Sequence, residues 1–146
     1  MSWVKLNVHL VFATKNRKPF LESKDIRLKV FEHILSNAKH KNIHFMSVNG
    51  WQEHIHCHIS LCKDQCIRDV AQLIKGESSF WINSNKLIKE KFNWQDDYWA
   101  VSVSESHVKV VQNYIYGQEE HHKTKSFAEE IDEFMNKYGW SLIKES

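Results

Sequence analysis

The sequence of 146 residues has one proline and four glycines, too few for a collagen-like chain or for an all-β chain rich in tight turns. It has no apolar run long enough to cross a bilayer. It also begins without the basic segment and apolar stretch of a secretory signal, so we expect a cytoplasmic protein. The length predicts a single domain over residues 1–146.

Cysteine is scarce as well. The three cysteines, Cys57, Cys62 and Cys66, cannot all pair with one another, and such neighbouring thiols favour a reducing compartment. A structural zinc site that combines Cys62 and Cys66 with nearby histidines is an alternative. The spacing Cys-x4-Cys-x3-Cys, however, matches no usual zinc motif.

An excess of charge of one sign is absent overall, since 20 Lys and Arg face 18 Asp and Glu and leave a formal net charge of +2. The distribution along the chain is uneven. Residues 1–50 carry nine basic and three acidic side chains, whereas residues 101–146 carry five basic and eight acidic ones. A basic N-terminal third fits an anionic partner such as nucleic acid.

The sequence does contain a clear order of strands and helices. Apolar alternation predicts strands, and apolar stripes at helical spacing predict helices. The expected strands cover residues 3–14, 43–48, 52–62 and 99–104. The expected helices cover residues 23–41, 67–88, 105–121 and 126–139, the last from a Ser126/Glu129 capping box to Gly139. Asn49-Gly50 predicts the hairpin turn between the second and third strands.

This order, β-α-β-β-α-β followed by two further helices, predicts an α+β fold of the ferredoxin-like (RRM-like) type. Such a fold has an antiparallel sheet with helices packed on one of its faces. The other face is then either covered by something else or is the working surface of the protein.

Histidines are concentrated in the strand expected over residues 52–62. Because side chains alternate along a strand, His54, His56 and His58 point one way, and Cys57 points the other way with its apolar neighbours. Two adjacent imidazoles bind one divalent metal when a third ligand arrives from elsewhere. We expect His54 and His56 to lie on the uncovered side of a central strand. His58 extends the row and is equally explained as part of a polar face.

A tyrosine and a glutamine share one stripe of the helix expected over residues 105–121. Tyr114 and Gln118 are one turn apart, so one helix is expected to present both side chains together. Gly117 lies between them and costs about 1 kcal/mol relative to alanine in a helix interior. That cost indicates a close approach or a flexible point.

Taken in order, these motifs resemble the HUH-class single-tyrosine transposases of small insertion sequences, and the REP-associated branch most of all. The resemblance spans nearly the whole chain. Its pieces are Thr14-Lys15-Asn16-Arg17, His54-Ile55-His56, Phe80-Trp81-Ile82-Asn83, Trp94-Gln95, Ser102-Val103-Ser104, Tyr114-Ile115-x-x-Gln118, Glu119-Glu120-His121-His122 and Phe127-x-x-Glu130. One departure is Glu53, which stands where the family usually has Asp.

The resemblance implies a DNA transposase that cleaves and rejoins single-stranded DNA at hairpin-containing ends. Tyr114 would attack a phosphodiester, form a 5′-phosphotyrosine and release a 3′-hydroxyl. His54, His56 and Gln118 would hold Mg²⁺ or Mn²⁺. Because the pKa of a phenol is near 10, phenolate is a better leaving group than an alkoxide, and the phosphotyrosine bond can therefore be reversed.

The resemblance also implies partners. In this family the tyrosine helix often comes from the other subunit, which implies a homodimer. Lys15, Arg17 and Lys18, at the end of the first expected strand, are the expected phosphate contacts to a DNA hairpin. Two other functions stay open: a metal-dependent nuclease that uses water, with Tyr114 structural, and a non-catalytic, domesticated relative that binds DNA hairpins.

Overall fold

A four-stranded antiparallel sheet organises the computed structural model, which describes residues 1–138. The strands are β1 (Leu6–Ala13), β2 (His44–Gly50), β3 (His54–Leu61) and β4 (Trp99–Val103). They lie in the order β2-β3-β1-β4, with every neighbouring pair antiparallel. With helices after β1 and β3, this order confirms the predicted ferredoxin-like α+β fold.

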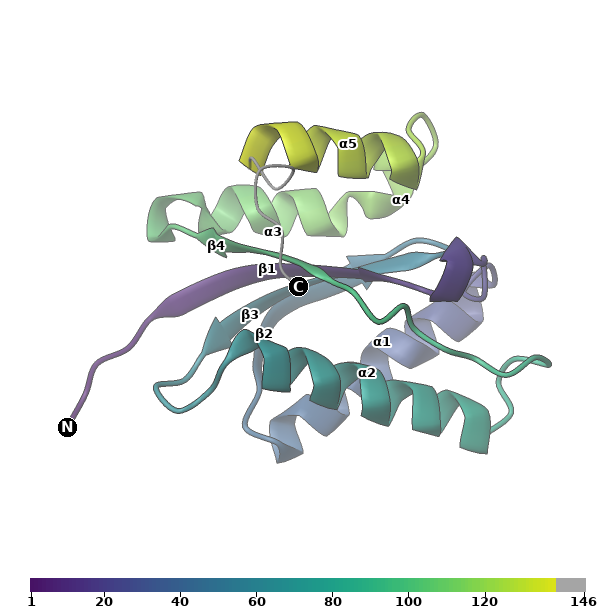
Figure 1. Cartoon of the computed structure of the whole chain (residues 1–146), viewed down its shortest axis with the longest axis horizontal. Coiled ribbons are helices and arrows are strands. Elements are labelled where there is room, and N and C mark those ends of the chain that lie inside the picture. The colour runs from purple at the N-terminus through teal and green to yellow at the C-terminus, as the bar shows by residue number, and fades with distance from the viewer. Residues whose placement is uncertain (139–146) are drawn as a thin grey trace.

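Two helices, α1 (Lys24–His40) and α2 (Ile67–Ser84), cover one face of the sheet (Figure 1). As predicted, Ser23 caps α1, where its side chain accepts a hydrogen bond from the Ile26 amide at 3.4 Å. The apolar side chains of the strands and of both helices form the main core between them. Its members include Leu10, Phe12, Val30, Ile34, Ile55, Cys57, Ile59, Val70 and Ile74.

The hairpin turn between β2 and β3 differs from the prediction. Asn49 and Gly50 belong to β2 and pair with β3, and residues 51–53 make the turn. Gly50 is required for close approach, because a Cβ built on it would lie 2.3 Å from the carbonyl oxygen of His54. The Asn-Gly signal therefore marks the tight pairing beside the turn.

The opposite face of the sheet is covered by α3 (Val108–Tyr116), α4 (Gln118–His121) and α5 (Phe127–Tyr138). Figure 1 shows α3 and α5 on the side of the sheet away from α1 and α2. A second core lies under them, formed by Val11, Ala13, Phe127, Ile131 and Phe134. The expectation of an uncovered histidine face is wrong, because these amphipathic C-terminal helices bury their apolar stripes against it.

The helix expected over residues 105–121 is interrupted. It consists of η2 (Glu105–His107), α3 and α4, with a break at Gly117, whose φ and ψ are −85° and 10°. Tyr114 and Gln118 therefore lie on two short helices. Gly117 also makes the close approach that the mid-helix glycine indicated, since a Cβ built on it would lie 3.2 Å from the carbonyl oxygen of Asn113.

The capping box before α5 is confirmed. The Glu129 amide donates to Ser126 Oγ at 3.2 Å, and the Ser126 amide donates to Glu129 Oε1 at 3.3 Å. The predicted end of this helix at Gly139 lies outside the described residues. No helix within residues 1–138 is long and apolar enough to cross a membrane.

Candidate active site

His54 and His56 are neighbours on the same face of β3, and both are buried under the C-terminal helices α3, α4 and α5. Their exposed fractions are 0%. The structure brings His54 to the predicted third ligand, because its Nε2 lies 3.0 Å from Oε1 of Gln118. His56 points to a different partner, and its Nε2 lies 3.1 Å from Oε1 of Glu130 on α5. The three predicted metal ligands thus enter one buried cluster.

The carboxylate of Glu130 lies at the centre of this cluster and is also fully buried. The Tyr114 hydroxyl donates a hydrogen bond to its Oε2. The side-chain amide of Gln118 donates to the same oxygen at 3.2 Å. Glu130 therefore joins the predicted nucleophile to the predicted ligands, although α3, α4 and α5 supply the three side chains separately.

A further histidine, His122, completes the cluster. Its Nε2 lies 3.0 Å from Gln118 Oε1 and 3.4 Å from Glu130 Oε1, and the Nε2 of His54 lies 3.2 Å from the latter. Possible ligand atoms of His54, His122 and Glu130 all lie within 4.8 Å of one another. Imidazole nitrogens beside carboxylate and amide oxygens form a donor set that suits a divalent metal. Among the described residues this set contains no cysteine.

Hydrogen bonding keeps the central carboxylate ionised. Burial alone would raise the pKa of Glu130, but hydrogen bonds from His122, His54 and His56 outweigh it and hold the pKa well below its usual range. The pKa of His54 is raised, because Glu130 and Glu53 more than compensate for its burial. The imidazoles that face the buried carboxylate therefore stabilise its negative charge.

The neighbouring groups are neutral. Burial lowers the pKa of His56 to about 4 and, together with the nearby His56, that of His9 to about 3. Burial and then the Glu130 charge raise the pKa of the Tyr114 phenol. Tyr114 is therefore held as the protonated phenol in this arrangement.

Of the two remaining polar residues on or beside β3, Glu53 contacts the cluster and His58 does not. Glu53 replaces the usual aspartate of the resemblance, and its Oε1 accepts a hydrogen bond from His54 Nδ1 at 2.7 Å. His58 faces elsewhere, and its Nε2 donates to Asn7 Oδ1 at 3.1 Å. The His-x-His pair thus contacts Glu130, whereas the third histidine of the row belongs to the neighbouring polar packing.

The predicted basic contacts lie on η1 (Lys15–Arg17) and the residue after it. Lys15, Arg17 and Lys18 are all exposed. The Arg17 guanidinium carbon lies 5.1 Å from the ring centre of Phe127, and that ring stacks on His54 with centres 4.0 Å apart. The structure thus brings Arg17 next to the cluster. The η1 segment begins just after β1 ends, at the same end of the two central strands as His54, which pairs with Ala13.

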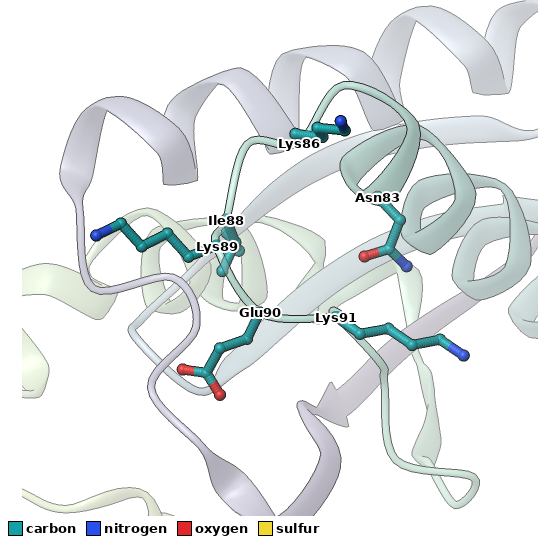
Figure 2. A pocket seen from close by; sticks show the side chains of 6 residues that line it. All are labelled: Asn83, Lys86, Ile88, Lys89, Glu90 and Lys91. Atoms are coloured by element: carbon teal, nitrogen blue, oxygen red, sulfur yellow. The ribbon is translucent and has the colours of Figure 1, made fainter.

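A lysine-rich loop follows α2 and borders η1. Lys86, Lys89 and Lys91 line an open pocket of about 700 Å³, and Figure 2 shows these side chains along the loop. Lys91 also lines a hollow of about 460 Å³ together with Lys15. Beside it, Lys18 forms an ion pair with Glu90. These lysines extend the basic surface of η1, but none of them lies in the histidine cluster.

His122 and Glu130 belong to the sequence motifs, but the sequence alone predicted no role for either of them. One signal for Glu130 is present in the sequence. In α5, Phe127, Ile131 and Phe134 recur at helical spacing, and Glu130 is a charged residue on the same buried face. A charge on a buried stripe needs a partner, and this marks Glu130 as a candidate site residue.

Two solved structures have a similar fold. A putative transposase from Deinococcus radiodurans R1 is 21% identical with a TM-score of 0.64, and the match covers 80% of this chain and 93% of that one. A REP-associated tyrosine transposase bound to a REP hairpin is 17% identical with a TM-score of 0.62, over 84% of this chain and 72% of the other. No curated protein matches the sequence significantly.

The sequence pattern of one protein family matches the greater part of the chain. This family is described as "Transposase IS200 like", and the match covers residues 2–118. It spans the whole sheet, both η segments and α3, and it ends at Gln118. The chain therefore belongs to the IS200-like transposase family.

Proposed function

We propose that the protein cleaves and rejoins single-stranded DNA at hairpin ends through a 5′-phosphotyrosine on Tyr114. The observation that carries this proposal is the hydrogen bond of Tyr114 to Glu130, the carboxylate that also contacts His56 and Gln118. Membership of a transposase family supports the reaction class.

The bond changes are those of a reversible phosphoryl transfer. The Tyr114 oxygen bonds to the phosphorus while the bond from phosphorus to the 3′-oxygen breaks. The phenol loses its proton, and the departing 3′-oxygen gains one. A second DNA 3′-hydroxyl reverses these changes and displaces the tyrosine, because a phenolate is a good leaving group. Glu130 holds the Tyr114 hydroxyl in place for this attack.

We propose that His54, His56 and Gln118 hold a divalent ion, Mg²⁺ or Mn²⁺. Such an ion, when bound, neutralises the charge that develops on a phosphate oxygen. The chain's own contribution is orientation. Glu53 holds the ring of His54 by Nδ1, and His9 holds that of His56, with His9 Nε2 2.8 Å from His56 Nδ1.

We propose a DNA hairpin as the partner and Lys15, Arg17 and Lys18 as phosphate contacts. Support comes from the related transposase whose structure contains a REP hairpin. All three side chains are exposed and Arg17 lies beside the histidine cluster, which also supports this assignment. We retain the homodimer as a proposal, although Tyr114 here contacts residues of its own chain. Sedimentation of the protein with and without DNA measures the oligomeric state.

Incubation with a labelled single-stranded hairpin oligonucleotide and Mn²⁺, followed by denaturing electrophoresis, tests the reaction. We expect a covalent protein–DNA adduct that is lost in Tyr114→Phe. Tyr116→Phe is the matched control, since Tyr116 lies on the same helix but is 61% exposed. Cleavage without an adduct that survives Tyr114→Phe would instead identify a nuclease that uses water. Binding without cleavage in any divalent metal would identify a DNA-binding module.

A further inference from the structure

We propose that His122 and Glu130 are metal ligands alongside His54, His56 and Gln118, and that the site prefers a first-row transition metal to Mg²⁺. This inference rests on the metal dependence of the proposed function but not on the role of Tyr114. It adds a histidine and a carboxylate from the segment after Gln118, where the family match ends.

The spacing of the donor atoms of His54, His122, Glu130 and Gln118 supports one shared ion, and His56 Nε2 adjoins them through its contact with Glu130 Oε1. Two ligands at right angles, each about 2.1 Å from a metal, lie about 3.0 Å apart, and at a tetrahedral angle about 3.4 Å apart. The contacts within the cluster span this interval. They are His54 Nε2 to Gln118 Oε1 at 3.0 Å and to Glu130 Oε1 at 3.2 Å, His122 Nε2 to the same oxygens at 3.0 and 3.4 Å, and His56 Nε2 to Glu130 Oε1 at 3.1 Å.

Each of the three imidazoles uses its other nitrogen outside the cluster. The Nδ1 atoms of His54, His56 and His122 contact Glu53 Oε1 at 2.7 Å, His9 Nε2 at 2.8 Å and the carbonyl oxygen of Lys125 at 2.8 Å, respectively. Carboxylate and carbonyl oxygens only accept, so Nδ1 carries the hydrogen in His54 and His122. Nε2 of each of these two rings then faces inward and can bind a metal in place of its contact with Glu130, which is how ligating histidines are usually oriented.

The inward side of the cluster is rich in acceptors. The Nε2 of His122 faces two acceptors, Gln118 Oε1 and Glu130 Oε1. Gln118 is oriented for this arrangement, because its amide nitrogen donates to Glu130 Oε2 and its oxygen faces the histidines. All of these atoms are buried, so the oxygens need a hydrogen or a cation facing them, and a bound metal ion would supply it for all of them together.

The chemistry of the donors selects the metal. Mg²⁺ prefers oxygen ligands and retains several waters, whereas the affinity of first-row transition metals for nitrogen ligands rises from manganese, the weakest of the series, towards copper. Three imidazoles against two oxygens therefore favour these metals over Mg²⁺. Five protein donors leave one position of a six-coordinate ion for a phosphate oxygen or water.

The proposed ligand set links the C-terminal segment to the sheet. His54 and His56 come from β3, Gln118 from α4, His122 from the residue after α4 and Glu130 from α5. An ion bound by all five ligands would link α5 to β3. Metal binding should therefore stabilise α5 as well as β3. This stabilisation can be measured without DNA and does not depend on the cleavage reaction.

Titration of the metal-free protein with Mn²⁺, followed by electron paramagnetic resonance and calorimetry, measures binding directly. We expect Glu130→Gln and His122→Asn to weaken Mn²⁺ binding by more than about 10-fold. His33→Asn is the matched control, because His33 also contacts a glutamate, Glu77 at 2.7 Å, but on the α1–α2 face. We also expect Mn²⁺ to slow amide hydrogen exchange over 127–138, and excess Mg²⁺ not to displace it. Circular dichroism checks that each variant is folded.

Two outcomes would overturn the inference. One is unchanged Mn²⁺ affinity in folded Glu130→Gln and His122→Asn with loss in His54→Asn, which would restrict the ligands to the His-x-His pair and Gln118. The other is a wild-type protein that binds Mn²⁺ no better than Mg²⁺. Neither outcome depends on the Tyr114 adduct, so failure of this inference and failure of the phosphotyrosine reaction are separate results.

Discussion

The Tyr114 hydroxyl donates a hydrogen bond to Glu130, a residue 16 positions later and on another helix. This contact joins α3 to α5 at the point where α5 also contacts the histidines of β3. The carboxylate is buried and anionic, so the hydrogen bond is of the charge-assisted kind. The orientation of the proposed nucleophile therefore depends on a helix that carries no part of the His-x-His or tyrosine motif.

This coupling can be measured as a double-mutant cycle. We expect Tyr114→Phe and Glu130→Gln each to lower the free energy of unfolding. The double variant should lose about 1 kcal/mol less than the sum of the two, because the charged hydrogen bond is counted twice in that sum. Urea unfolding of the metal-free proteins gives the three values. Losses that add within about 0.3 kcal/mol would show that the two side chains do not interact.

Gly117→Ala tests whether the break between α3 and α4 is needed for activity. A Cβ at Gly117 would lie 3.2 Å from the carbonyl oxygen of Asn113, and alanine favours continuation of α3 through the break. Gln118 would then turn away from His54, so we expect adduct formation to fall by about 100-fold, the cost of a misplacement near 1 Å. The rate of covalent adduct formation is the measurement.

Gly76→Ala is the control for this change. Gly76 lies exposed within α2, and a Cβ there would meet nothing within 4 Å. We expect this variant to gain about 1 kcal/mol of unfolding free energy and to keep full activity. Equal activity of Gly117→Ala and Gly76→Ala would contradict the need for a break between α3 and α4.

The basic surface predicts a salt-dependent affinity for DNA. Lys15 and Lys91 line the same hollow, so the phosphates of one DNA strand can contact both side chains. We expect the variant with both changed to alanine to bind hairpin DNA more weakly. The slope of log K against log salt should fall by about 0.7–0.9 for each phosphate contact removed.

Lys63→Ala controls for loss of charge alone. Lys63 is exposed just beyond Leu61, at the end of β3 away from His54. We expect its affinity and salt slope to match the wild type. Equal salt slopes for Lys63→Ala and for the double variant at Lys15 and Lys91 would place the DNA on another surface.

Thiol labelling tests how β3 divides its side chains between the two faces. Cys57 is fully buried in the main core, and burial raises the pKa of its thiol, whereas Cys66 is exposed. In the native protein we expect rapid labelling of Cys66 and none of Cys57, and in urea labelling of all three cysteines. Mass spectrometry of the labelled peptides reads each site. Native labelling of Cys57 would show that β3 does not pack on α1 and α2.

Short-range periodicity accounts for the parts of the fold that were predicted correctly. Alternation in β3 separates Cys57 and Ile59 from the histidines, and helical stripes predict α1 and α2. The hairpin was misplaced because Asn49-Gly50 has two physical uses. A glycine allows a tight turn, and it equally allows the close strand approach that Gly50 makes to His54.

The site was predicted only in part, because its parts meet through tertiary packing. The His54–His56 pair follows from strand geometry and Gln118 from its spacing after Tyr114. Glu130 reaches His56 across 74 positions of sequence, and no local pattern gives that distance. The prediction of an uncovered histidine face was wrong for the same reason, because the sequence does not indicate which surface the C-terminal helices pack against.

The order in which the site's residues occur along the chain has a consequence for protein synthesis. The ribosome completes the whole sheet and Tyr114 before it reaches Glu130 on α5. Until α5 emerges, the growing chain lacks the carboxylate that orients the tyrosine and the helix that buries His54 and His56. A nascent chain can therefore fold its sheet early while the proposed DNA-cleaving centre is assembled last.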